Sequence, residues 1–186
     1  MATYSQPRID LDSIEALDVH VHAEIGCDGH DPMPGDLREA SQKYFRDGGG
    51  TPSVTDVAAY YRERGLACVV FTVDYEPHSG IAAVSNEEIA AVAADNADVM
   101  IPFASVDPAR PDAAERAQRL IRDHGVRGFK FHPNLQEFFP NDRSAYPLYE
   151  VIEEARLPAL FHTGHSGIGS GPVSYTHLTL PTTPYV

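Results

Sequence analysis

The sequence predicts an α/β protein built on parallel strands, and two observations support this class. Apolar segments with the β-branched and aromatic residues typical of buried parallel strands occur at 16–21, 66–73, 100–106, 128–132 and 158–163. Helical patterns separate them, and after the second segment the spacing is roughly 30 residues, the size of one βα unit. Repeated βα units build a parallel sheet that is either open or closed as a barrel.

The expected helices carry start and stop signals of their own. They are expected at 54–64, 86–97, 112–124 and 147–156. Ser53 with Asp56 three residues later predicts a variant capping box, and Ser85 with Glu88 predicts a better one. Gly125 is the expected C-cap of the third helix, and a proline opens the fourth.

Histidines stand at the ends of three of the expected strands. His20 and His22 close the first, His132 the fourth and His162 the fifth. The carboxyl ends of the strands are where (β/α)₈ barrels place their chemistry. No G-x-G-x-x-G motif follows the first strand, which disfavours a dinucleotide fold. The sequence therefore predicts a TIM-like (β/α)₈ barrel, with His20 and His22 on one face of a strand as half of a metal site.

Composition excludes several classes of partner. The net charge of −13 argues against nucleic acid and against anionic membrane surfaces, which require basic patches. The sequence contains no run of about 18 apolar residues, so no transmembrane helix is expected. The polar N-terminus does not resemble a signal peptide. Cys27 and Cys68 give no disulfide framework. We expect a cytoplasmic protein.

The connection after the first strand is unusually long, roughly residues 23–52, and rich in glycine. Loops of this length are uncommon and are usually functional or disordered. A lid over the strand ends is one interpretation, and an insertion without a role is the other.

The last residues do not continue the pattern. The string from Val173 to Thr182 has no charged residue and resembles the translation of a sequencing adaptor. We expect one domain over residues 1–171, a non-native tail over residues 172–186, and no ligand at His177. The native part then has about 170 residues and five strands, whereas a complete (β/α)₈ barrel typically has about 250 residues and eight strands.

The motifs together resemble the amidohydrolase superfamily. They are Leu-Asp-Val-His-Val-His-Ala at residues 17–23, Gly-Phe-Lys-Phe-His-Pro-Asn-Leu-Gln at residues 128–136 and Leu-Phe-His-Thr-Gly at residues 160–164. Their order and spacing are most similar to the amidohydrolase-related (amidohydrolase 2) branch, which includes proteins like aminocarboxymuconate-semialdehyde decarboxylase.

The resemblance implies a set of metal ligands. His20 and His22 match the first-strand ligands and His162 matches the fifth-strand ligand. The implied cofactor is a divalent metal, with Zn²⁺ favoured by three imidazoles and a water. The histidine of the family's sixth strand and the aspartate of its eighth have no counterpart, so we expect the fragment itself to be inactive.

Other residues are candidates for catalysis or substrate contact. Lys130 and His132 share one face of the fourth strand. Four roles stay open for each of them: metal ligand, substrate contact, catalytic group or structural residue. His165, Asn134 and Phe45 are candidate substrate contacts. His30, His78 and His124 are expected on the surface.

The implied function is a metal-dependent hydrolase that attacks a small organic acid or acyl compound, of aromatic origin in one reading, with metal-activated water. The alternative is a metal-dependent decarboxylase, a carbon–carbon lyase acting on an aromatic or semialdehyde carboxylate. A barrel that binds a ligand without chemistry is a second alternative. The expected partner is a small-molecule substrate, and a homodimer is one option for the full-length protein.

Overall fold

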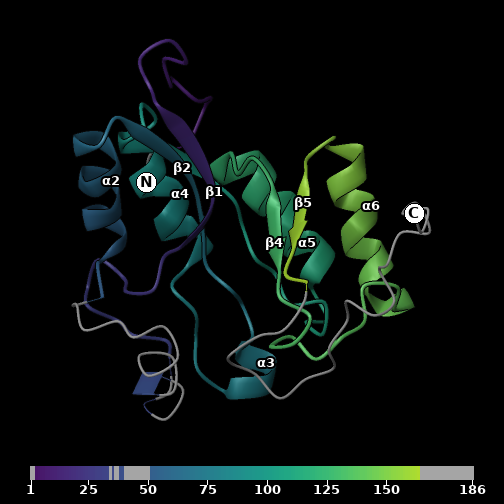
Figure 1. The fold of residues 1–186 in the computed structure, drawn as a ribbon. Coiled ribbons are helices and arrows are strands. Elements are labelled where there is room, and N and C mark those ends of the chain that lie inside the picture. The colour runs from purple at the N-terminus through teal and green to yellow at the C-terminus, as the bar shows by residue number, and fades with distance from the viewer. Residues whose placement is uncertain (1–2, 34, 36–37, 40–50, 164–186) are drawn as a thin grey trace, which may run out of the picture.

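The computed structural model describes residues 3–33, 35, 38–39 and 51–163. Five strands alternate with helices along this part of the chain (Figure 1). The strands are β1 (Ala16–His22), β2 (Leu66–Phe71), β3 (Met100–Pro102), β4 (Phe129–Phe131) and β5 (Ala159–Phe161). The helices are α2 (Val54–Glu63), α3 (Glu76–Ser79), α4 (Asn86–Asp95), α5 (Ala113–Arg119), η1 (Leu120–His124), η2 (Arg143–Ala145) and α6 (Tyr146–Glu154).

All strand pairings among the described residues are parallel. The strands form one sheet in the order β1-β2-β3 and a second in the order β4-β5. A bridge between Ala104 and Phe129 joins the two sheets, and the amide of Lys130 donates to the carbonyl of Ala104 at 2.7 Å. The five strands therefore follow each other in chain order, as in the first part of a (β/α)₈ barrel, which confirms the predicted class.

The helices cover the outer side of the strands. Figure 1 shows α2 beside β1 and β2, and α6 beside β4 and β5. One apolar cluster packs α2 and α4 against the first sheet through residues such as Val57, Val70 and Ile89. A second packs α5 and α6 against the second sheet, with Phe129 and Leu148 at its centre. Because the helices bury the outer faces of the two sheets, the remaining side chains of the strands point to the inner side.

The helix starts differ from the expected ranking. Ser53 and Asp56 form a complete reciprocal capping box. Ser85 accepts a hydrogen bond from the amide of Glu88 at 3.0 Å, but the Glu88 carboxylate receives the amide of Cys27 instead of closing the box. The prediction that Ser85 carries the better box is therefore wrong, because the amide of Cys27 occupies the Glu88 carboxylate that would have accepted the amide of Ser85.

Most elements are shorter than their expected ranges, and two of them show the cause most clearly. The helix predicted over 112–124 is α-helical only to Arg119 and continues as the π-helical turn η1 to Gly125, which caps it in the left-handed conformation. The strand predicted over 100–106 ends at Pro102, which has no N–H to donate to a neighbouring strand. Beyond it, Ala104, Ser105 and Val106 stay buried without regular pairing.

Several predictions lie outside the described residues. These are the central part of the proposed lid, with Phe45, as well as His165 and the tail at residues 172–186. No helix in the described part of the chain is long and apolar enough to cross a membrane.

Candidate metal centre

The two histidines of β1 face the inside of the barrel because β1 contains an irregularity. Asp18 pairs with Cys68 and Val21 with Val70, so β1 has one more residue than β2 over this stretch. The side chains of Asp18 and His20, two residues apart, therefore point to opposite faces of the strand instead of to the same face. Its Oδ2 accepts a hydrogen bond from the hydroxyl of Tyr61 on α2 at 2.7 Å.

The imidazoles of His20 and His22 stand side by side. Their Nε2 atoms are 3.2 Å apart, and both rings contact Phe71, with centroid distances of 5.4 and 4.9 Å. Two nitrogen ligands of one tetrahedral zinc ion, each at about 2.0–2.1 Å from the metal, lie about 3.3 Å apart. The pair thus has the spacing that one shared ion requires.

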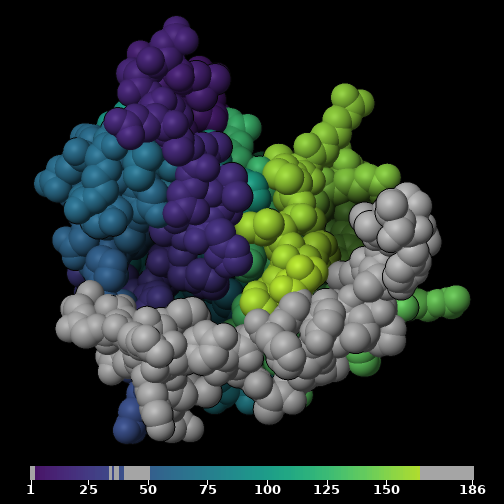
Figure 2. Space-filling view, viewed as in Figure 1, coloured from purple at the N-terminus to yellow at the C-terminus, as the bar shows by residue number. Residues whose placement is uncertain are grey.

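Lys130 and His132 of the fourth strand project toward the same interior. The Lys130 side chain is fully buried, with its Nζ 3.2 Å from Nε2 of His20 and 4.9 Å from the ring centroid of Phe71. The His132 ring stacks on His162, with centroids 4.1 Å apart and planes inclined by 10°. In Figure 2, β1 (purple) and β5 (yellow) lie on the same face of the molecule, on either side of a narrow hollow.

Burial keeps these imidazoles neutral. It is the main cause that lowers the pKa of His22 to about 3 and that of His132 to about 3, and the nearby Lys130 adds to both shifts. The pKa values of His20 and His162 are also lowered, again first by burial and then by Lys130. Neutral imidazole is the form that binds a metal.

Lys130 is the cation of the cluster. Burial lowers the pKa of its ammonium group to about 8, so it still carries most of its charge at neutral pH. Across residues 3–33, 35, 38–39 and 51–163, Lys130 has no ion pair with a carboxylate. A buried charge without a protein counter-ion is costly unless a ligand supplies one.

The third expected ligand is near the pair but not joined to it. His162 lies close enough to His20 and His22 to influence them electrostatically, and its buried Nε2 has no hydrogen-bond partner among the described residues. However, no three metal-binding side chains in the described ranges already converge on one point. The structure therefore preforms the His20–His22 pair and leaves His162 stacked on His132. Asn134 is buried in the turn that follows β4.

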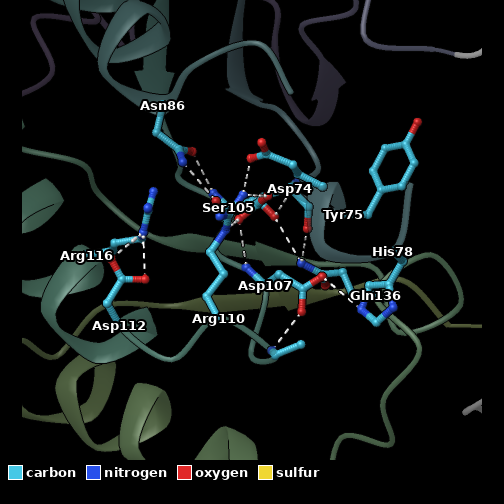
Figure 3. Close-up of polar contacts among 12 residues, drawn as sticks. Asp74, Tyr75, His78, Asn86, Ser105, Asp107, Arg110, Asp112, Arg116 and Gln136 are labelled. Carbon is cyan, nitrogen blue, oxygen red and sulfur yellow. Dashed lines mark hydrogen bonds and ion pairs between the residues drawn. The ribbon is translucent and has the colours of Figure 1, made fainter. Parts of the chain in front are cut away.

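A buried polar network at the ends of β2, β3 and β4 was not anticipated (Figure 3). Asp74 accepts hydrogen bonds from Arg110 Nε at 2.7 Å and Nη2 at 2.8 Å, and from the amide of Asp107 at 3.0 Å. Both carboxylates directly follow apolar stretches, at Val73 and Val106. An acidic residue at the carboxyl end of a buried strand was the signal that could have identified them.

His78 is exposed, as expected, and it also contacts this network. Its Nε2 lies 3.2 Å from Oδ2 of the fully buried Asp107, and its Nδ1 lies 3.5 Å from Glu137. Burial raises the pKa of Asp107 to about 6 despite a hydrogen bond from the amide of Ala109. No periodic pattern predicts this contact, because α3 is a single helical turn.

Comparison with known proteins identifies the family. The family model described as Amidohydrolase matches residues 17–184, so this chain belongs to the amidohydrolase family. A comparison with curated proteins gives no match.

The chain also matches solved structures, and the first of the two described below supports the likeness in fold. An uncharacterised TIM-barrel protein from Bordetella bronchiseptica matches with a TM-score of 0.55 and 22% identity, over 87% of this chain and 59% of that one. A 5-carboxyvanillate decarboxylase from Novosphingobium aromaticivorans, complexed with manganese and 4-hydroxy-3-methoxy-5-nitrobenzoic acid, matches with a TM-score of 0.49 and 13% identity, over 88% of this chain and 55% of that one. The chain thus spans a little over half the length of these proteins.

Proposed function

We propose that this chain carries the metal-binding strands of a metal-dependent hydrolase acting on a small organic acid or acyl compound. The observation that supports this most directly is the His20–His22 pair, whose Nε2 atoms lie 3.2 Å apart at the carboxyl end of β1. His162, at the end of β5, is the proposed third ligand. Three imidazoles favour Zn²⁺ over the harder Mg²⁺ or Ca²⁺.

The protein's own part in this site is to present neutral nitrogen atoms on rigid strands. Because burial keeps the pKa of His22 near 3, the ring does not have to lose a proton before it binds an ion at neutral pH. A bound divalent ion supplies Lewis acidity, which activates water and polarises a carbonyl group.

Lys130 defines the kind of substrate. Its ammonium group is buried beside His20 without a protein carboxylate in the described ranges, so an anionic group of a ligand can pair with it. In hydrolysis the same charge would stabilise negative charge that develops on an acyl oxygen. This supports a substrate that carries a carboxylate or forms an oxyanion.

Decarboxylation is the second candidate, and the same lysine supports it, since a carboxylate held by Lys130 is the group that such a reaction removes. Product analysis of the full-length protein separates the two reactions: release of CO₂ without consumption of water indicates the decarboxylase. If a full-length protein binds metal and ligand but gives no product, the site is a binding site without chemistry.

Cobalt binding by the 186-residue chain tests the metal proposal, because Co²⁺ takes zinc sites and absorbs visible light. We expect saturable binding that His22→Asn weakens by at least about 100-fold, as the loss of a ligand should. His124→Asn serves as the matched control, since His124 lies at the end of η1 and outside the cluster. Equal cobalt affinity in His22→Asn and His124→Asn would refute the proposal.

A further inference from the structure

The amide of Gln136 is a buried connection between three strand ends that the proposed function does not yet use. The residue is only 1% exposed. Its Oε1 accepts a hydrogen bond from the amide of His132 at 2.8 Å. Its Nε2 donates to the carbonyl of Asp74 at 2.8 Å and approaches Oγ of Ser105 at 3.4 Å. One side chain thus joins the ends of β4, β2 and β3 (Figure 3).

The chemistry of the partners fixes how the amide is oriented. The His132 amide can only donate and the Asp74 carbonyl can only accept, so a flipped Gln136 would lose both hydrogen bonds. A carboxylate or a hydrocarbon chain of the same length cannot make both contacts. The position therefore requires a side-chain amide.

Gln136 occupies the place of a missing strand partner. The amide of Lys130 pairs with the carbonyl of Ala104, on the β3 side of β4. His132, two residues later, directs its own amide to the same side, but regular pairing has ended there. The side chain of Gln136 accepts this amide, and the backbone amide of Gln136 donates to the His132 carbonyl at 2.9 Å. Both backbone groups of His132 are thereby held by one residue.

The partners of Gln136 are themselves fixed. Ser105 is held by Asn86, which accepts its amide and donates to its carbonyl, each at 2.8 Å. The Asp74 carboxylate is bound by Arg110 through two nitrogen atoms. Gln136 therefore connects His132 to a rigid network and not to a flexible loop.

We propose that Gln136 is a positioning residue for the metal centre. It holds the end of β4 so that the His132 ring stacks on His162 and sets the position of that third ligand. The link from His162 to a metal rests on the proposed function, whereas the link from Gln136 to His132 does not. The two parts can therefore be tested separately.

Hydrogen exchange at the His132 amide tests the first part without metal. In Gln136→Met the amide loses its acceptor, and we expect it to exchange about ten-fold faster than in the wild-type chain. Gln136→Glu keeps an acceptor and should retain most of the protection, which also covers the case in which Gln136→Met does not fold. Gln118→Met, on the exposed side of α5, is the control. Unchanged exchange at His132 in Gln136→Met, or equal losses of protection in the Met and Glu variants, would overturn the proposal.

Cobalt affinity of the folded variants tests the second part. Partners that orient metal ligands typically contribute 10- to 100-fold in affinity, so we expect Gln136→Met to bind Co²⁺ about ten-fold more weakly than Gln118→Met. A purely structural role would lower stability and leave this affinity unchanged, and that result would overturn the positioning role. If the wild-type chain binds no Co²⁺, the proposed function fails, and exchange at His132 alone decides the role of Gln136.

Discussion

Burial and one buried lysine together set the charge state of the candidate metal centre. Lys130 is fully buried, and its charge contributes to the lowered pKa values of His20, His22, His132 and His162. These groups favour each other's neutral forms, so the lysine is the one member of the cluster that keeps most of its charge at neutral pH. The centre is arranged to receive negative charge, and it carries an energetic cost until it does.

Lys130→Met should therefore stabilise the ligand-free chain. At pH 7 we expect the free energy of unfolding to rise by about 1–3 kcal/mol, because a buried ammonium without a counter-ion is replaced by an apolar group of similar length. The pKa of Lys130 is about 8 in the fold and 10.5 as its ordinary value. Between these values the folded state binds fewer protons than the unfolded state, so the wild-type chain gains stability as pH rises.

Urea unfolding at pH 7 and at pH 10.5 measures this effect. The advantage of Lys130→Met should shrink between the two, because at pH 10.5 the wild-type lysine is neutral in the folded state and half neutral in the unfolded state. A lower stability of the variant at pH 7, or an advantage that does not depend on pH, would contradict this account of Lys130.

Asp107→Asn should remove a contribution that makes the stability of the wild-type chain fall as pH rises, opposite in sign to that of Lys130. The folded pKa of Asp107 is about 6, above its ordinary value of 3.8, so the folded state binds the proton more tightly. Its contribution to stability is therefore complete below pH 4 and is lost as pH rises through 6. Relative to Asp107→Asn, the wild-type chain should lose about 2 kcal/mol of unfolding free energy between pH 4 and pH 7.

Asp112→Asn is the matched control for this measurement. Arg116 lowers the pKa of the exposed Asp112, so its contribution to stability is present at neutral pH and lost on acidification. The two variants should change the pH profile in opposite directions. Parallel profiles of wild type and Asp107→Asn between pH 4 and pH 7 would show that this carboxyl is not perturbed.

At the scale of single elements, sequence patterns predicted starts and ends better than side-chain contacts. The capping box at Ser53 and the glycine cap at Gly125 depend on residues close in sequence, and both were confirmed. The box at Ser85 failed because Cys27, distant in sequence, supplies a competing amide. The register shift in β1 was also unforeseen, since it depends on the pairing with β2.

Gly125 offers a test at this scale. Its φ is +69°, and a Cβ there would lie 1.8 Å from the carbonyl oxygen of Tyr4, whose ring is buried and whose hydroxyl donates to the Met100 carbonyl. Gly125→Ala should lower the free energy of unfolding by about 3 kcal/mol, the sum of a left-handed backbone and a displaced N-terminal segment.

Gly80→Ala separates the two contributions. Gly80 has a similar φ of +71°, but a Cβ there meets nothing within 4 Å. Only the backbone cost of about 1 kcal/mol should remain. Equal destabilisation by the two substitutions, measured by thermal or urea unfolding, would show that Tyr4 is not seated against Gly125.

At the scale of the whole molecule, the order of elements and the position of the histidines could be predicted from the sequence. Apolar segments alternate with amphipathic ones, which sets the parallel order, and His20, His22, His132 and His162 all fall at the carboxyl ends of strands. The stacking of His162 on His132 and the role of Gln136 could not be predicted, because both depend on how separate strands meet.

The central claim is that His20, His22 and His162 bind one metal ion, and anomalous X-ray diffraction at the zinc edge from zinc-loaded crystals of this chain tests it most directly. We predict one peak per chain, within about 2.0–2.1 Å of the Nε2 atoms of all three histidines. A peak at any other set of side chains, or none at this position at full zinc loading, would contradict it.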